Sequence, residues 1–229
     1  MTWPNACWPR SITSDDGRLI VTRTAVAHLK RADPVLRRVM ESVGPCRYAP
    51  RSDGSHFDAL LRAILYQQLS GKAAATIHQR MRAVYGDRDP LPGELLATAD
   101  ETLRAAGVSR QKTGYLRDLA AHVADGRLPL DEIALLEDEE VINALVSVKG
   151  IGRWSAQMFL IFRVGRLDVV PELDLGIQKG IQLAYGLPEL PRPRDVLRIA
   201  EPWTPYRTIA SWYLWRLLDQ DDPPRPEPR

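Results

Sequence analysis

The sequence predicts a mainly α-helical protein. Apolar residues recur at helical spacing in most segments, as at Phe57, Leu60, Leu61, Ile64 and Leu65. These segments are bounded by Gly, Pro, Asp or Ser, the residue types that cap helices or end them. No convincing alternation of apolar and polar residues appears outside the first thirty residues, so any β structure is expected only at the N-terminus.

The same periodicity places the helices along the chain. They are expected at 56–68, 71–85, 110–124, 138–147, 153–164, 175–185, 194–201 and 205–219. Proline-rich segments at 89–92 and 187–191 separate helical blocks. Four prolines in the segment 221–229 predict a disordered tail.

Length and composition exclude several classes of protein. A chain of 229 residues with 45% hydrophobic content can bury its own core, and its longest apolar stretches fall far short of the roughly 18 residues of a membrane span. The first residues lack the basic and then apolar pattern of a secretory signal, so a cytoplasmic location is expected. Only Cys7 and Cys46 are present, too few for a four-cysteine iron–sulfur or zinc site, and we expect neither a metal cluster nor a disulfide.

Charge is unevenly distributed along the chain. The net charge of +2 permits an anionic partner without requiring one. Residues 131–140 carry six acids and no base, which indicates a solvated face and the acidic first turn of a helix. The basic residues that follow this run are Lys149, Arg153, Arg163, Arg166 and Lys179. One face of the protein is therefore expected to be basic and another acidic.

Two glycines one residue apart, Gly150 and Gly152, separate two amphipathic segments. Glycine tolerates positive φ and leaves the backbone open to close approach, so consecutive N–H groups can converge on a phosphate at the start of the second helix. Lys149 and Arg153 would add positive charge there. A Gly-x-Gly by itself is more often a simple helix-to-helix connection, so the surrounding residues decide between the two interpretations.

Three motifs in order carry a family resemblance. Residues 145–156, with Gly150-Ile151-Gly152 before a Trp-Ser-Ala helix start, resemble the helix-hairpin-helix of DNA repair glycosylases. Residues 168–177 resemble the Gly/Pro-rich loop and aspartate of that superfamily, and residues 67–74 (Gln-Gln-Leu-Ser-Gly-Lys-Ala-Ala) match a third segment. The chain is therefore similar, over about 56–216, to the HhH-GPD superfamily and within it to the 3-methyladenine DNA glycosylase II (alkylbase DNA glycosidase) group.

The resemblance implies an all-α glycosylase fold of two helical subdomains with the active-site cleft between them. Residues 1–55 would pack with the C-terminal helices, 56–165 would contain the helix-hairpin-helix at about 138–164, and 166–220 would carry the catalytic aspartate. It further implies a monomer, associated with the nucleoid, that acts on double-stranded DNA containing alkylated bases and needs no cofactor. The resemblance allows one bound ion, a monovalent cation that hairpin carbonyls would hold in the DNA complex.

Asp174 is the candidate catalytic carboxylate. Breaking an N-glycosidic bond builds positive charge on the deoxyribose, which requires a fixed anion and an oriented water. Asp174 directly precedes the expected helix 175–185, so it is predicted to be the N-cap, where the helix dipole favours the charged form. An aspartate in this position is by itself more often only a cap, and the resemblance is what assigns catalysis. Many relatives have an acid directly before it, whereas here Leu173 fills that place and Glu172 lies one residue further back.

The resemblance also separates the alternative activities. Superfamily members that cleave the DNA strand carry a lysine directly after Gly-x-Gly-Arg, and here that position is Trp154, so base removal without AP lyase chemistry is expected. Trp154 and the missing cysteine cluster disfavour a bifunctional or mismatch-directed enzyme. The main alternative of another class is a non-catalytic helix-hairpin-helix DNA-binding module, from which Asp174 would distinguish an enzyme.

A damaged base must leave the duplex before its sugar bond is accessible, which requires an aromatic pocket. Trp154 and Trp215 match tryptophans that line this pocket in the alkyl-base enzymes, and Trp212 and Tyr206 lie on the same C-terminal segment. Met158 occupies a position that is often tyrosine. Stacking of indoles on cationic 3-methyladenine or 7-methylguanine contributes roughly 0.5–2 kcal/mol. For Trp212 and Tyr206, ordinary core packing is an equal alternative.

The remaining expected DNA contacts come from two loops. The turn at 67–69 aligns with the segment that inserts into the base stack, so Gln68 or Leu69 is the expected wedge. The other expected DNA-binding residues are Gln67, Ser70, Lys149, Gly150, Ile151, Gly152, Arg153 and Ser155. The four histidines show no metal-ligand spacing and receive no role.

Overall fold

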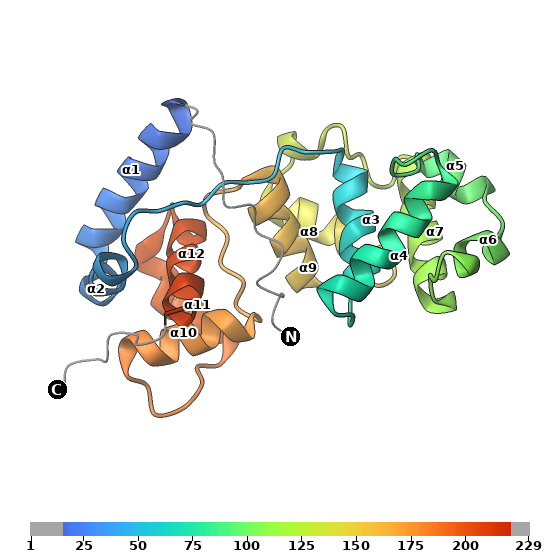
Figure 1. Ribbon diagram of the computed structural model, residues 1–229. Helices are drawn as coiled ribbons and strands as arrows, with labels where there is room; N and C mark the ends of the chain where they lie inside the picture. Colours follow the sequence, from blue (N-terminus) through green and yellow to red (C-terminus); the bar gives the residue numbers. More distant parts are fainter. Residues whose placement is uncertain (1–15, 221–229) are drawn as a thin grey trace. The chain divides into compact units, whose positions relative to one another are not determined.

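The computed structural model describes residues 16–220, with side chains from residue 22, and divides them into two compact units (Figure 1). Within the described residues, unit 1 comprises 16–50 and 165–220, and unit 2 comprises 51–164. Every regular element from 16 to 220 is helical, which confirms the predicted fold class. Residues 16–43, in the region to which any β structure was expected to be confined, form two helices. Residues 1–15 and the tail expected to be disordered, 221–229, lie outside the described residues.

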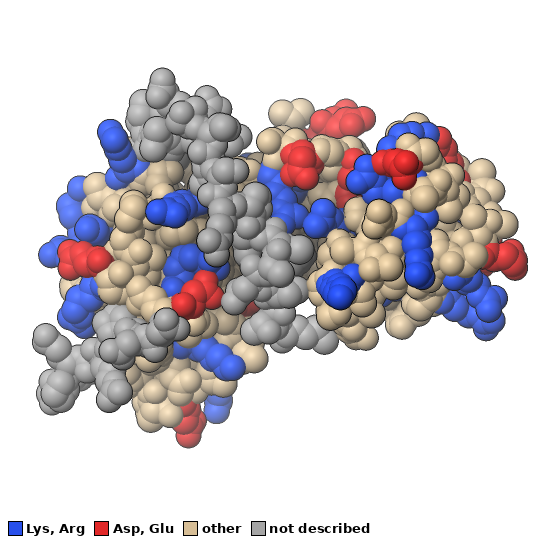
Figure 2. Space-filling view, in the orientation of Figure 1, with Lys and Arg blue, Asp and Glu red and all other residues tan. Residues whose placement is uncertain are grey.

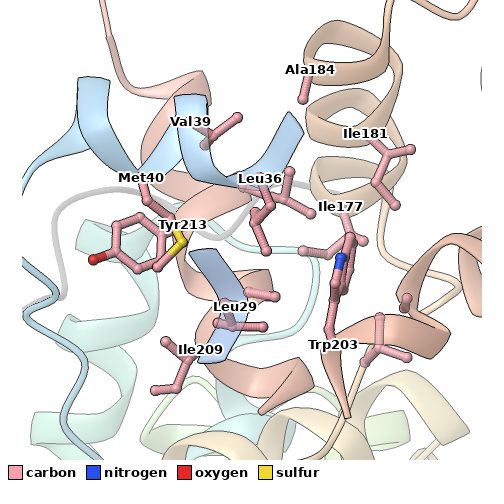
Figure 3. Close-up of a cluster of buried hydrophobic side chains, with 14 of the residues drawn as sticks. Leu29, Leu36, Val39, Met40, Ile177, Ile181, Ala184, Trp203, Ile209 and Tyr213 are labelled. Atoms are coloured by element: carbon pink, nitrogen blue, oxygen red, sulfur yellow. The ribbon is translucent and has the colours of Figure 1, made fainter. Parts of the chain in front are cut away.

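Unit 1 combines two N-terminal helices with the C-terminal helices of the chain. Its elements are α1 (Asp16–Ala32), α2 (Pro34–Val43), α10 (Leu175–Tyr185), α11 (Pro193–Ala200), the short 3-10 helix η4 (Glu201–Trp203) and α12 (Arg207–Leu218). Figure 3 shows apolar side chains of α1, α2, α10 and α12 meeting in one core, with Leu29, Leu36 and Ile177 fully buried. The core therefore holds α10, the helix that Asp174 precedes, between elements from both ends of the sequence.

A buried carboxylate, Asp33, ties three elements of this unit together. As the N-cap of α2, its Oδ1 accepts the N–H groups of Val35 and Leu36 at 2.9 and 3.0 Å. Its Oδ2 accepts the hydroxyl of Tyr185 at the end of α10 and, at 2.8 Å, the indole N–H of Trp203 in η4. Four donors thus compensate the burial of one charge, and they fix the end of α10 opposite to Asp174.

Substitution Tyr185→Phe tests this arrangement. Removing the hydroxyl leaves the buried carboxylate of Asp33 one donor short, so we expect the free energy of unfolding to fall by about 1–2 kcal/mol. Urea denaturation followed by circular dichroism measures the change. The matched variant is Tyr213→Phe, which removes a hydroxyl that donates to the neutral carbonyl of Gly44 at 3.1 Å. If Tyr185→Phe lowers the free energy of unfolding no more than Tyr213→Phe does, the carboxylate of Asp33 gives its hydrogen bond no added strength.

Unit 2 is a second helical bundle with its own core. Its elements are α3 (His56–Tyr66), α4 (Gly71–Val84), α5 (Pro92–Ala97), α6 (Asp100–Ala105), α7 (Arg110–Ala124), η2 (Ile133–Leu135), α8 (Asp138–Val146), α9 (Arg153–Phe159) and the π-helix η3 (Leu160–Val164). The apolar stripes predicted for 56–68 and 110–124 are buried, and Leu60, Leu61, Leu116 and Leu119 are at most 2% exposed. Two hydrophobic clusters predicted from sequence spacing thus form the centre of this unit.

Several boundaries differ from the predicted ones for identifiable reasons. The helix expected over 56–68 ends at Tyr66, because Gln68 adopts a positive φ of 56° that no helix continues. The helix expected over 153–164 is α-helical only to Phe159 and then widens into a π-helix. The short helices α5 and α6 were not predicted, because six residues show too little periodicity to be recognised.

The segment that leads into unit 2 is held by Arg163. Its guanidinium donates to the carbonyl oxygens of Arg51 at 3.3 Å, of Asp53 at 2.7 Å and of Gly54. Its Nε donates to Nδ1 of His56 at 3.1 Å. The imidazole of His56 must therefore offer a lone pair to Arg163, which requires the neutral ring.

This contact predicts a pH dependence of stability. Burial and the guanidinium of Arg163 lower the pKa of His56 below the ordinary 6.5, and Asp131 offsets this only in part. The unfolded chain binds a proton at this histidine near pH 6.5 while the folded chain does not. The contribution to stability is thus present above about pH 6.5 and is lost as the pH falls from there through the lower pKa of the folded state. We expect His56→Gln to flatten the dependence measured by thermal unfolding between pH 8 and pH 5; an unchanged slope would contradict this.

Candidate functional site

Asp174 is the N-cap of α10, as the sequence predicted. Its exposed fraction is 7%. Its Oδ1 accepts the N–H of Ile177 at 2.9 Å, and the same oxygen accepts the indole N–H of Trp215 at 2.9 Å. Two donors from different helices therefore orient the carboxylate. The sequence assigned these two residues to the catalytic group and to the base pocket, and the structure joins them by a direct hydrogen bond.

Gly176 makes this close approach possible. A Cβ atom at this position would lie 2.9 Å from Oδ1 of Asp174, closer than real Cβ atoms come, and 3.0 Å from Cδ1 of Trp215, which is tighter than most real contacts. Any side chain would thus displace the carboxylate or the indole. Sequence analysis assigned Gly176 no role, although a glycine in the first turn of a helix is a recognisable signal because glycine disfavours helix formation.

An ion pair fixes the loop that leads to Asp174. Arg207, at the start of α12, donates from Nε and Nη2 to the two carboxylate oxygens of Asp168 at 2.8 and 2.9 Å. The hydroxyl of Thr208 accepts the N–H of Val169 at 3.1 Å and donates to the carbonyl of Arg166 at 2.7 Å. The loop from Arg166 to Asp174 is thereby attached to the helix that carries Trp215, so both partners of the hydrogen bond are positioned by α12.

The other aromatic candidates in unit 1 have packing roles in the structure. Tyr206 contacts His28 edge to face with ring centroids 5.4 Å apart, and Trp212 contacts Tyr213 in the same way at 5.0 Å. Both are half-buried against the core cluster. By contrast, Leu173 is 49% exposed directly beside Asp174. The apolar surface next to the carboxylate thus includes an exposed leucine.

Two aromatic-pocket candidates belong to unit 2. Trp154 lies in the first turn of α9 and is half-buried, and Met158, one turn later, is 6% exposed. Met158 is therefore part of the buried surface of α9. The helix begins at Arg153, so this one residue separates Trp154 from the hairpin.

The hairpin at 147–152 forms the tight connection that the two glycines predicted. Gly150 has a φ of 87°, and the N–H of Ile151 donates to the carbonyl of Val148 at 3.1 Å. Gly152 is the N-cap of α9, where no side chain supplies the cap. Gly150 and Gly152 are both exposed, so the backbone of the hairpin is accessible to a partner.

The turn at 67–70 lies against this hairpin. The side-chain amide of Gln67 donates to the carbonyl of Gly150 at 2.8 Å. Gln68 and Leu69 are exposed, the latter 36%, and Ser70 caps α4 by accepting the N–H of Ala73 at 3.3 Å. Two segments that are more than seventy residues apart in the sequence are therefore adjacent within unit 2, with the two wedge candidates on the surface.

Charges near the hairpin are partly engaged within the protein. Arg153 forms a two-pronged ion pair with Glu139 at 2.9 and 2.6 Å, which lowers the pKa of Glu139. The acidic first turn of α8 therefore neutralises one of the cations predicted to bind phosphate, whereas Lys149 is exposed. Ser155 is half-buried in the first turn of α9. Figure 2 shows basic side chains exposed on both units with acidic ones interspersed, so the face in this view is mixed rather than uniformly basic.

The described residues also bear on membrane and metal sites. None of the described helices is both long and apolar enough to cross a membrane. Among the described residues, no group of three or more His, Cys, Asp or Glu side chains is arranged to hold a metal ion. Cys46 is a free thiol whose pKa is raised to about 11 by burial, and Cys7 lies outside the described residues.

A helix-hairpin-helix, a Pro-containing loop and a capped aspartate in this order define a class of protein. Residues 61–205 match the HhH-GPD superfamily of base excision DNA repair proteins, and the chain belongs to that superfamily. Among its relatives, it is 36% identical to DNA-3-methyladenine glycosylase 1 of Schizosaccharomyces pombe, over 89% of this chain and 92% of that protein. It is 32% identical to the alkylbase DNA glycosidase-like protein mag2 of the same yeast, over 85% and 93%.

Solved structures agree with this assignment. The S. pombe 3-methyladenine DNA glycosylase Mag1, in complex with abasic DNA, matches with a TM-score of 0.74 at 35% identity, over 86% of this chain and 98% of that one. The DNA-3-methyladenine glycosidase of Bacillus halodurans matches with a TM-score of 0.78 at 37% identity, over 84% and 88%. The resemblance predicted from three motifs is thus confirmed over most of the chain.

Proposed function

We propose that this protein is a DNA glycosylase that removes alkylated bases of the 3-methyladenine and 7-methylguanine class and leaves an abasic site. The observation that carries the proposal is the carboxylate of Asp174, which is nearly buried at a helix N-terminus and oriented by Ile177 and Trp215. Family membership and relatives named as 3-methyladenine glycosylases support it. Asp33 shows that a buried capping carboxylate can be purely structural in this fold, so it is family membership that favours catalysis over capping at Asp174.

The chemistry follows from the charge that the reaction develops. As the N-glycosidic bond breaks, the sugar becomes cationic, and the carboxylate of Asp174 stabilises this charge and orients the attacking water. Two N–H donors hold the carboxylate in one orientation, so little reorganisation is needed when the charge appears. Cationic alkylated bases are already good leaving groups, so strong acid catalysis at the base is not required.

Trp215 in unit 1 and Trp154 in unit 2 are each proposed to stack on a flipped base, with Trp212 and Tyr206 supporting Trp215, and Met158 supporting Trp154, within their own units. An indole attracts a cationic base more strongly than a neutral one, which favours alkylated over normal bases. Gln68 or Leu69, both exposed at the turn, would fill the space that the base leaves.

The hairpin is proposed to anchor the DNA backbone without reading its sequence. Within the described residues, the N–H groups of Gly150 and Gly152 are not used in the hydrogen bonds of the hairpin itself, and Lys149 adds charge beside them. Hydrolysis proceeds without a cofactor in this proposal, and hairpin carbonyls hold a monovalent cation when DNA is bound. The protein acts as a monomer at the nucleoid.

Trp154 in the position of the lyase lysine supports hydrolysis without strand cleavage. Oligonucleotides that each contain one lesion, treated with heat and alkali after incubation, reveal abasic sites and test the proposal. We expect release of 3-methyladenine or 7-methylguanine and no covalent adduct on borohydride treatment. Binding without release would indicate a non-catalytic module, and a trapped adduct would contradict the absence of lyase activity.

A further inference from the structure

Lys112 of α7 supports the end of α3 from within unit 2. Its Nζ donates to the carbonyl of Leu65 at 2.6 Å and to the carbonyl of Gln67 at 2.7 Å. These belong to the last turn and the cap of α3, where carbonyls lack partners within the helix. Partial burial lowers the pKa of Lys112. An ammonium is thus held in a half-buried position, directly under the turn that presents Gln68 and Leu69.

One turn further along α7, the ring of Tyr115 lies directly beneath the hairpin. A Cβ at Gly150 would be 2.3 Å from Cδ2 of Tyr115, so the backbone of the hairpin rests on the ring. Gln111 donates to the hydroxyl of Tyr115 at 2.6 Å and fixes its orientation. Gly150 is therefore needed for two reasons, its positive φ and the space above this ring.

One turn beyond Tyr115, Asp118 holds the backbone of the hairpin. Its Oδ2 accepts the N–H of Lys149 at 2.8 Å. His122, one turn further along α7, is 5% exposed, and Nδ1 of its ring lies 2.8 Å from the carbonyl oxygen of Asp118. This contact supports Asp118 from below the surface. Residues 112, 115 and 118 recur every three positions and so lie within an arc of about 120° around α7.

We infer that α7 is a brace that holds the wedge turn (67–70) and the hairpin (147–152) in one fixed arrangement. Lys112 holds the turn, Tyr115 and Asp118 hold the hairpin, and Gln67 links the two loops directly through the carbonyl of Gly150. The three α7 side chains are positioning residues: they act through the loops. Only the consequence for DNA binding rests on the proposed function. DNA binds two loops that are already ordered, so less conformational entropy is lost on binding.

Hydrogen exchange of the free protein tests the brace without DNA. We expect Asp118→Ala to speed exchange of the Lys149 amide by about tenfold or more, because it loses its acceptor, and Lys112→Met to speed exchange across 66–70. Lys112→Arg keeps a cationic donor and should restore most of the protection. Unchanged exchange at both loops would overturn the brace. Faster exchange throughout unit 2 would also overturn it, because that pattern indicates general destabilisation.

The consequence for DNA is tested with a duplex that carries a tetrahydrofuran abasic-site analogue. We expect Lys112→Met to raise the Kd by about tenfold, because the wedge turn must then be ordered on binding. Arg104→Met is the control, since it removes an exposed cation of α6 in the same unit and should change the Kd by less than about threefold. In a Leu69→Ala background the effect of Lys112→Met should shrink. If Lys112→Met and Arg104→Met raise the Kd equally, the positioning role of Lys112 is contradicted. If the wild-type protein binds no duplex, the proposed function is contradicted, and the hydrogen-exchange result alone then tests whether α7 is a brace.

Discussion

Asp174→Asn is expected to lower the single-turnover rate of base release by at least about a hundredfold, because it removes the anion that stabilises the developing sugar cation. The fold should survive. Asparagine is as good an N-cap as aspartate, and its Oδ1 can still accept the N–H groups of Ile177 and Trp215. The rate is measured with duplex containing a single 7-methylguanine, and the affinity for the abasic-site analogue should stay within about threefold.

The matched control is Asp195→Asn, the same change in the first turn of α11 in the same unit. It should leave the rate of release unchanged. If Asp174→Asn kept more than about a tenth of the wild-type rate, the carboxylate would be only a helix cap, and a different group would have to stabilise the cation.

The sequence predicted the parts of this site that have a local signature. A glycine pair between amphipathic segments indicated the hairpin, and an aspartate before an apolar-periodic segment indicated the N-cap of α10; the structure has both features at these residues. The pattern was weaker in α1, where the run Leu19-Ile20-Val21-Thr22 is rich in β-branched residues. Its helical state is determined by packing, since Ala25 and Leu29 are fully buried in the core of unit 1.

The contacts that position the site could not be predicted in this way. Trp215 and Asp174 are forty-one residues apart, and Lys149 and Asp118 are thirty-one apart. Nothing in the residues around either partner indicates the other, because these pairs form only when separate helices pack. A prediction from periodicity places each helix and its buried face, but not which polar side chain at its edge meets which backbone group.

Gly150→Ala is expected to lower the free energy of unfolding by about 2–5 kcal/mol. A non-glycine residue at a φ of 87° costs about 1–2 kcal/mol, and a methyl group 2.3 Å from the ring of Tyr115 adds a packing strain of about 1–3 kcal/mol. Urea denaturation measures the loss. The hairpin should shift away from α7, so the Lys149 amide should also exchange faster.

Gly152→Ala is the control that separates strain from access. At this position φ is −100° and a Cβ would meet nothing within 4 Å, so the stability of the free protein should change by less than about 0.5 kcal/mol. Its methyl group would nevertheless stand where the phosphate is proposed to approach, and DNA binding should weaken. In a Tyr115→Ala background the clash is absent but the backbone strain remains, so Gly150→Ala should cost less stability there than in the wild-type protein. Equal destabilisation by the two glycine substitutions would show that α7 does not support the hairpin through Gly150.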